Sequence, residues 1–387
     1  MFLVSLNRAL RSKKWFNNND INEPNLIDYL DLVSLGTVCD VVPLIGLNRA
    51  IVKQGLKVIK LKKNLGIKTL LDVCKIESSP SIYHLGYLIG PRINAGGRVG
   101  KCSHGANLLL NKDPKNSFLL ASELDQYNKE RQLLEKDLLQ EILNKAKNYS
   151  NDPVLILSGS NWHEGVIGIV AARLKDKFNK PVIIISLDGD IGKASARSII
   201  GFDIGAVIIA AAHENILLKG GGHKMAGGFS IKVENIEKLK DFVFKKFRNI
   251  NIDLKSERPL LLDSIISPSA INLEFYNKVA LLSPFGSGNP EPMFIIEDVK
   301  TVNGKIVGEK HIKSVLVGND GSTIKCIAFN AVENDIGAYL LKTNKKSFNI
   351  AGKLSLNEWK GQSNVEFIID DISVNKTFKK MVPSSIG

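Results

Sequence analysis

Residues 153–187 read PVLILSGSNWHEGVIGIVAARLKDKFNKPVIIISL, and this stretch decides the fold class. Its two ends, residues 153–159 and 181–187, are short apolar runs of the length expected for buried strands. The segment between them, residues 165–179, carries its apolar residues at helical spacing. Strands that alternate with a helix in this way indicate an α/β layer domain.

The chain continues this alternation on the C-terminal side of the stretch. We expect a strand at residues 192–199, a helix at 203–215, a strand at 229–233 and a closing helix at 236–247. GGGHKMAGG, residues 220–228, interrupts the pattern, and we interpret it as a glycine-rich loop.

The two flanks of this α/β domain, which we place at residues 151–252, have different patterns. Residues 1–114 show helical spacing and are expected to be mainly helical. Residues 115–150 contain neither Gly nor Pro and predict one long connecting helix, with a coiled-coil arm as the alternative. Residues 253–378 contain short strands separated by turn signals, which favour a small β-barrel of the oligonucleotide-binding (OB) type. The predicted fold class is therefore α/β with several domains.

The composition narrows the class of partner. The chain has 387 residues, of which 44% are hydrophobic, and a formal net charge of +13. This charge favours a polyanionic partner, either nucleic acid or an anionic membrane, although lysines on solvated faces are an alternative explanation. No apolar run reaches the ~20 residues of a membrane span, so we expect no membrane segment. The four cysteines lie far apart, which argues against zinc or disulfides and favours a reducing, cytoplasmic compartment.

Two segments of the helical region carry residues suited to binding ions. GTVCDVVPL, residues 36–44, places Asp40 in an apolar run, where a carboxylate must be paired, act as a cap or bind a metal. One aspartate does not hold a catalytic metal by itself, because divalent cations take several ligands. GPRINAGGR sets Arg92 and Arg98 around Asn94. These arginines could grip a phosphate, or the segment could be a tight loop whose arginines pair with carboxylates.

Three segments of the α/β domain predict a phosphate site. His163 and Glu164 open a helix whose free N–H groups suit an anion, although a structural histidine is the alternative. KASARS places Ser195 and Arg197 at alternate strand positions and hence on one face, unless Arg197 pairs with a surface carboxylate. The glycine-rich loop around His223 could form a nest of backbone N–H groups, or it could be a plain connector. Taken together, the segments favour a phosphate ligand.

Six segments, in this order, resemble those of the RecJ family of single-strand-specific 5′→3′ DNA exonucleases, in the DHH phosphoesterase superfamily. The resemblance covers residues 2–373 and rests on GTVCDVVPL, GPRINAGGR, WHEGVIGI, KASARS, GGGHKMAGG and SPFGSGNPEP. It implies that residues 1–114 are the C-terminal remainder of a DHH domain and that 151–252 form a DHHA1 domain. It also implies DNA repair and recombination, a Mn²⁺ or Mg²⁺ cofactor and single-stranded DNA as partner, with a single-strand-binding protein and a recombination helicase as helpers.

The resemblance also implies a role for each candidate site residue. Asp40 corresponds to a metal-binding aspartate, and His163 to a catalytic residue. The residues that would bind the DNA strand or its 5′-phosphate are Arg92, Asn94, Arg98, Ser195, Arg197, Gly221, Gly222 and His223. In the OB barrel, Trp359 and Phe367 could stack on bases, with core packing as the alternative for each.

The chain departs from the family pattern at its start. The aspartate-rich motifs and the Asp-His-His triplet of the DHH domain do not occur in the sequence. We therefore expect the chain alone not to assemble the two-metal centre of this chemistry. The missing half would belong to a longer reading frame or to a separate chain, or the protein would be a remnant that binds 5′-phosphorylated single strands without cutting them. A relative that cleaves short oligonucleotides or cyclic dinucleotides is a third interpretation, which the C-terminal barrel disfavours.

Overall fold

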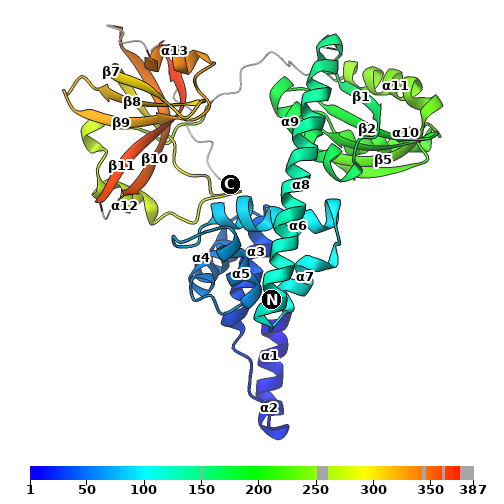
Figure 1. The fold of residues 1–387 in the computed structure, drawn as a ribbon, viewed down its shortest axis with the longest axis horizontal. Helices are drawn as coiled ribbons and strands as arrows, with labels where there is room; N and C mark the ends of the chain where they lie inside the picture. The colour runs from blue at the N-terminus through cyan, green and yellow to red at the C-terminus, as the bar shows by residue number, and fades with distance from the viewer. Residues whose placement is uncertain (150, 251–259, 342–345, 360–361, 375–387) are drawn as a thin grey trace. The chain divides into compact units, whose positions relative to one another are not determined.

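The computed structural model divides into two compact units (Figure 1). One unit comprises Met1–Cys39 and Gln54–Glu257, and the other comprises Asp40–Lys53 and Arg258–Gly387. Within the described ranges, no helix has the length and hydropathy needed to cross a membrane. The structure describes residues 1–149, 151–250, 260–341, 346–359 and 362–374.

The first 110 residues form a set of helices, as their apolar spacing predicts. Buried side chains such as Leu70, Leu85 and Leu108 make up their core. Asn64 caps one helix by accepting a hydrogen bond from the Ile67 N–H (3.0 Å). In chain order the helices are α1 (Phe2–Ser12), α2 (Trp15–Asn18), the 3₁₀-helix η1 (Leu26–Tyr29), α3 (Leu30–Cys39), α4 (Gly46–Lys60), α5 (Leu65–Val73), the π-helix η2 (His84–Ile89), α6 (Gly90–Val99) and α7 (Ser103–Leu110).

The arginine-containing segment GPRINAGGR is helix α6, not the tight loop that one interpretation of its glycines predicts. Pro91 stands in the first turn of α6, directly after the π-helix η2. A Cβ at Gly96 would lie 2.6 Å from the carbonyl oxygen of Lys101. The glycine therefore allows close packing of the chain on the helix rather than a loop.

Helix α8 (Pro114–Ala146) confirms the prediction of one long helix after residue 114. Asp113 caps its start by accepting hydrogen bonds from two N–H groups of the first turn. The coiled-coil alternative is wrong, because both halves of the helix are packed within the first unit. The N-terminal half buries Leu124 in the helical core, and the C-terminal half buries Ile142 against the α/β domain.

The α/β domain contains a five-stranded sheet with the order β1-β2-β3-β5-β4. Strands β1 and β2 are parallel, and the other neighbours are antiparallel. The strands are β1 (Leu155–Ser160), β2 (Val182–Asp188), β3 (Ile191–Arg197), β4 (Lys219–His223) and β5 (Ala226–Lys232). One face of the sheet packs on α9 (Glu164–Phe178) and on the C-terminal half of α8. The opposite face packs on α10 (Ile204–His213) and α11 (Ile236–Arg248) (Figure 1).

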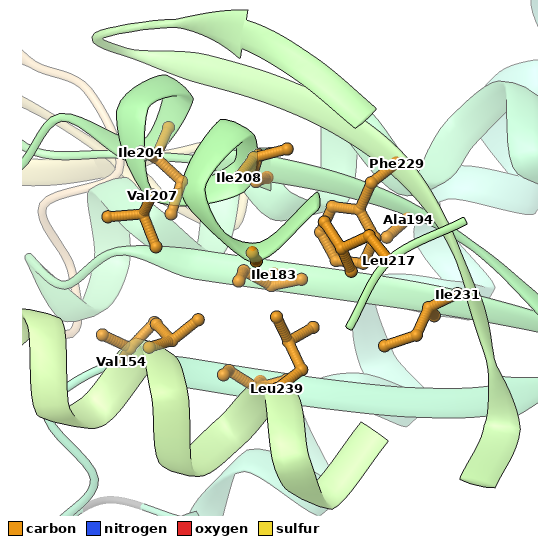
Figure 2. Close-up of a cluster of buried hydrophobic side chains, with 14 of the residues drawn as sticks. Val154, Ile183, Ala194, Ile204, Val207, Ile208, Leu217, Phe229, Ile231 and Leu239 are labelled. Atoms are coloured by element: carbon orange, nitrogen blue, oxygen red, sulfur yellow. The ribbon is translucent and has the colours of Figure 1, made fainter. Parts of the chain in front are cut away.

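The larger core of this domain lies between the sheet and helices α10 and α11 (Figure 2). Ile183, Phe229 and Ile231 project from the sheet, and Ile208 and Leu239 project from the helices. All five side chains are buried. This face is therefore closed, and the opposite face of the sheet is the one that can meet a ligand.

The glycine-rich stretch GGGHKMAGG is a β-hairpin, not the loop predicted from its composition. Strands β4 and β5 pair Gly221 with Gly228 and Gly222 with Gly227. A Cβ at Gly222 would lie 2.4 Å from the carbonyl oxygen of Ala226, so a larger residue would not fit. A nest of N–H groups needs successive residues in turn conformations. The nest prediction is therefore wrong for these extended strands.

Five strands of the second unit close into a barrel, which confirms the predicted OB-type domain. Strands β7 and β10 pair and close the ring β7-β8-β9-β11-β10, in which β9 and β11 are parallel. The elements are β6 (Ser264–Ile265), the 3₁₀-helix η5 (Pro268–Ala270), α12 (Leu273–Ala280), β7 (Phe294–Val307), β8 (His311–Val317), β9 (Thr323–Ala328), α13 (Asp335–Leu341), β10 (Phe348–Trp359) and β11 (Gln362–Ser373).

The two aromatic residues proposed as stacking platforms in the barrel have different outcomes. Phe367 lies in the barrel core and is 0% exposed, together with Phe294 and Phe348. Stacking on a base needs an accessible ring, so this prediction is wrong for Phe367. The side chain of Trp359 lies outside the described residues.

We expect Cys102 to react with iodoacetamide in the native protein while Cys326 stays unmodified. Cys102 is exposed, whereas Cys326 is 2% exposed inside the barrel, where burial raises the pKa of its thiol. Peptide mass spectrometry after brief alkylation measures both sites, and urea-unfolded protein is the control in which both react. Equal labelling of the two cysteines in native protein would contradict a closed barrel core.

Candidate nucleic-acid interface

One face of strands β3, β5 and β4 presents polar and small residues. Directly opposite residues of antiparallel strands lie on the same face of a sheet. Basic side chains occupy the ends of this face, and small residues occupy its centre. The pairings define three neighbouring rows, Lys193–Ser230–Lys219, Ser195–Gly228–Gly221 and Arg197–Ala226–His223.

Helix α9 covers only part of this face. It passes over β3 at Gly168, where a Cβ would lie 2.9 Å from Ser195 Oγ and 3.1 Å from Arg197 Nη2. A cavity of about 630 Å³ lies between the first turns of α9 and the glycine-rich strands. The glycines leave space there that larger side chains would fill. The lining includes Glu164, Ile167, Lys193, Ser195, Gly220, Gly221 and Gly228.

Arg197 is a half-buried cation on this face. It donates hydrogen bonds to Ser195 Oγ (3.1 Å) and to the carbonyl oxygen of Ala196 (2.8 Å). No carboxylate of the described residues pairs with it, so the alternative of a surface ion pair is wrong. Burial lowers the pKa of Arg197, and the nearby charge of Arg98 lowers it further. A partly desolvated guanidinium without a counterion suits an anionic ligand.

Arg98 connects the end of α6 to the start of α9. Its Nη1 donates a hydrogen bond to the carbonyl oxygen of Gly165 (3.0 Å). The side chain lines a second cavity, of about 530 Å³, with Gly97, His163, Glu164 and Gly165. The first N–H groups of a helix attract anions. The Arg98 guanidinium and the start of α9 can therefore act on one phosphate group.

His163 is the N-cap residue of α9. Its Nδ1 accepts a hydrogen bond from the Gly165 N–H (3.1 Å), which is the structural role that the sequence left open. The cap leaves Nε2 as the remaining ring nitrogen, on an exposed imidazole beside the second cavity. Glu164 pairs with Lys193 (2.7 Å) and places a carboxylate at the same edge. A catalytic role for His163 stays a prediction.

The end of the glycine hairpin lies against helix α10. A Cβ at Gly205 would lie 2.8 Å from the His223 N, so the start of α10 touches strand β4. His223 is exposed, and its Nδ1 accepts a hydrogen bond from the Met225 N–H (3.3 Å). Gly221 lines the 630 Å³ cavity, whereas Gly222 and His223 are not part of its lining.

Asn94 and Arg98 line a third, smaller cavity of about 160 Å³, together with Gly86, Gly90 and Arg131. Arg92, which the sequence grouped with them, is not in its lining. Helix α6 therefore separates the arginines of GPRINAGGR, because Arg92 and Arg98 project toward different surroundings.

Arg92 supports the helical packing. Its Nε donates to Asp125 Oδ1 (2.8 Å), and its Nη1 donates to the carbonyl oxygen of Leu88 (2.8 Å). Burial would raise the pKa of Asp125, but hydrogen bonds from Lys129 and Arg92 outweigh it and lower that pKa. The carboxylate-pairing alternative is thus correct for Arg92, and a contact of Arg92 with DNA stays a prediction.

Arg131 belongs to a buried ion-pair network that the sequence analysis missed. Its Nη1 lies 2.8 Å from Glu135 Oε2, and Nη2 of Arg173 lies 2.5 Å from Glu135 Oε1. Burial lowers the pKa of Arg131, against the opposing effect of Glu135. The spacing of Arg131 and Glu135 on α8 is visible in the sequence, but Arg173 comes from α9. This network places a second arginine, Arg131, beside Asn94 and Arg98 in the lining of the 160 Å³ cavity.

Asp40 is exposed at the end of α3, not buried as its apolar neighbours suggested. Nowhere in the described ranges do three His, Cys, Asp or Glu side chains gather in a group that could hold a metal ion. A two-metal site with Mn²⁺ or Mg²⁺ needs several oxygen or nitrogen ligands. The described residues therefore do not fit that cofactor by themselves, and a ligand role for Asp40 stays a prediction.

Replacing Gly165 with alanine is expected to lower the free energy of unfolding by about 1–3 kcal/mol, because a Cβ there would lie 2.3 Å from the carbonyl oxygen of Arg98. The matched control is Gly36→Ala in α3, where a Cβ meets nothing within 4 Å. That change should be neutral or stabilising, since alanine favours helix. Urea denaturation followed by tryptophan fluorescence measures both, and equal stabilities would contradict the close contact.

Two protein-family models match separate parts of the chain. The model described as the DHHA1 domain matches residues 151–249. The model described as the RecJ OB domain matches residues 262–371. The two matches coincide with the α/β domain and with the barrel.

Two curated proteins, both described as single-stranded-DNA-specific exonuclease RecJ, are similar along nearly all of the chain. The protein of Salmonella typhimurium is 34% identical over 393 residues, covering 96% of this chain and 65% of that protein. The protein of Bacillus subtilis is 30% identical over 359 residues, covering 90% of this chain and 44% of that protein. The chain therefore spans less than two thirds of the length of these relatives.

A solved structure shows the same fold. The crystal structure of RecJ from Thermus thermophilus in complex with Mg²⁺ matches with a TM-score of 0.79 at 28% identity, covering 94% of this chain and 54% of that chain. The match extends over the helical part, the α/β domain and the barrel. It confirms the predicted fold class.

Proposed function

Because this chain belongs to the RecJ family, we propose that it binds the 5′-phosphorylated end of single-stranded DNA at the cleft formed by α6, α9 and β3. One observation supports this above all, namely that Arg197 is half-buried beside Ser195 without a carboxylate partner among the described residues. A 5′-phosphate would supply the missing anion. Arg98 and the N–H groups at the start of α9 would bind it from the other side of the cleft.

The glycines at the centre of the sheet face leave room for a nucleotide beside that phosphate. Gly221 and Gly228 leave the centre of the sheet face without side chains, and Lys193 and Lys219 stand at its edge. Sugar and base would occupy the space over the glycines, while the lysines attract the next phosphates. Binding of this kind depends on backbone charge rather than on sequence.

For the complete protein we propose 5′→3′ exonuclease activity that depends on Mn²⁺ or Mg²⁺. Crystal structures of Thermus thermophilus RecJ are described as complexes with each of these ions. The 387 residues of this chain would bind DNA ends but not cut them, because their described part gathers no metal-binding group. A longer form of the chain or a separate chain would supply the ligands. With DNA as its substrate, the protein would act in the cytoplasm. A single-strand-binding protein and a recombination helicase would be further partners.

The test compares three fluorescent probes: single-stranded DNA with a 5′-phosphate, the same strand with a 5′-hydroxyl, and a blunt duplex. Anisotropy should show the tightest binding for the phosphorylated strand. For each phosphate contact, the logarithm of the association constant should fall by about 0.7 for every tenfold rise in salt concentration. Equal affinity for the first two probes would rule out recognition of the 5′ end. Adding Mn²⁺ should release no mononucleotide from any probe, and release by the isolated chain would overturn the non-catalytic part of the proposal.

A further inference from the structure

Two tyrosines form an exposed, stacked pair at the start of the π-helix η2, where Tyr83 directly precedes the helix and Tyr87 lies within it. The ring centroids of Tyr83 and Tyr87 are 5.3 Å apart, and their planes differ by 24°. Tyr83 is 59% exposed and Tyr87 is 71% exposed. Packing in the helical core therefore does not explain these rings. Single π-helical turns often occur at functional sites.

The pair stands on the same continuous helical rod as Arg98 of the proposed phosphate site. Helix η2 runs into α6 without a break, since one ends at Ile89 and the other begins at Gly90. Gly86 directly precedes Tyr87 in the sequence, and Gly90 follows Tyr87 by three residues. Gly86 and Gly90 both line the 160 Å³ cavity that also contains Asn94, Arg98 and Arg131.

The spacing along this rod suits a short length of single strand. Tyr87 precedes Arg98 by 11 residues, which corresponds to about 16 Å along the helix at ~1.5 Å per residue. A stacked strand rises by ~3.4 Å per nucleotide. A strand with its 5′-phosphate at Arg98 would therefore reach the tyrosines after about five nucleotides. The cation of Arg98 favours a path of the phosphates along this side of the rod.

We propose that Tyr83 and Tyr87 form a base-stacking subsite for the single strand whose 5′-phosphate binds between Arg98 and Arg197. This inference rests on the proposed function and adds a second contact point to it. The two tyrosine rings offer an aromatic surface to bases of any identity, because every base has a π-face. A duplex would keep its bases stacked and paired, so the subsite also favours single strands.

The experiment measures binding of two 5′-phosphorylated oligothymidylates, a decamer and a dinucleotide, by calorimetry with the 387-residue chain. Tyr83→Ala and Tyr87→Ala should each weaken decamer binding about five-fold or more. Neither should change dinucleotide binding, because the dinucleotide is too short to reach the pair. Tyr87→Phe should keep the affinity for the decamer. The matched control is Tyr29→Ala, whose ring is similarly exposed at 55% but lies on η1.

A decamer with abasic sites at positions four to six separates stacking from indirect effects. Stacking predicts that the abasic decamer binds wild type and the Tyr83→Ala/Tyr87→Ala double variant equally. If the double variant weakens the normal and the abasic decamers to the same extent, the subsite does not bind bases. If wild type prefers the 5′-phosphate but the double variant binds the normal decamer as tightly as wild type, the stacking subsite is wrong while the proposed function stands. Failure of wild type to prefer the 5′-phosphate would instead overturn the proposed function.

Discussion

Replacing Glu135 with alanine is expected to lower the free energy of unfolding by about 3–5 kcal/mol. Glu135 has a side chain that is only 3% exposed, and it is paired with Arg131 of its own helix and with Arg173 of α9. Without the carboxylate, the charge of Arg131, whose side chain is 12% exposed, would be left buried and uncompensated. Urea denaturation followed by tryptophan fluorescence measures the loss.

The control for this variant is an ion pair with little burial. Glu237 pairs with Lys240 on α11 at a spacing of three, and its side chain is 80% exposed. Glu237→Ala should cost less than about 1 kcal/mol, because an exposed pair is well solvated in both states. If the two variants lost the same stability, burial of the Glu135 network would not be the cause.

Replacing Arg197 with alanine is expected to abolish the preference for a 5′-phosphate. Hydrogen bonds to charged groups contribute about 1.5–3 kcal/mol, so affinity for the phosphorylated strand should fall about 10- to 150-fold. Affinity for the 5′-hydroxyl strand should change little, because the partner of Arg197 is absent from it. Arg197→Lys should restore only part of the preference, since an ammonium lacks the planar fork of the guanidinium. Anisotropy titrations with the two strands measure the ratio.

Arg248→Ala provides the control for net charge. Arg248 is an exposed cation in the last turn of α11, away from the residues that line the cavities. Its loss should weaken both strands slightly and to the same degree through general electrostatics. An Arg197→Ala variant that behaved in the same way would place Arg197 outside the phosphate site.

The strand and helix order of the α/β domain and the barrel could be predicted, because burial on one face imposes a period on the sequence. The glycine hairpin could not. Gly221 and Gly228 carry no side chains that reveal their pairing, and glycine has a low intrinsic preference for strands. Their partners are fixed by β3 and by the close approach of α10 at Gly205, which are tertiary contacts.

Part of the candidate site could also be predicted from the periodicity of the sequence. Ser195 and Arg197 share a face because a strand has a period of two, and the pairings agree with that prediction. Helix α6 was harder to foresee, since glycine disfavours helices and only packing at Gly96 explains its place there. The exposure of Asp40 and the pairing of Arg173 with Glu135 depend on contacts between distant segments, which periodicity does not report.

Helix α8 links two hydrophobic cores through one uninterrupted rod. Leu124 belongs to the core of the helical region, and Leu138 and Ile142 belong to the core shared with α9. Inserting one residue between Leu124 and Leu138 would turn one set of side chains by about 100° relative to the other, at 3.6 residues per turn. The number of residues in this rod therefore sets the rotation of the helical region relative to the α/β domain, which carry the two sides of the cleft. Substitutions along α8 should consequently be tolerated far more easily than insertions or deletions.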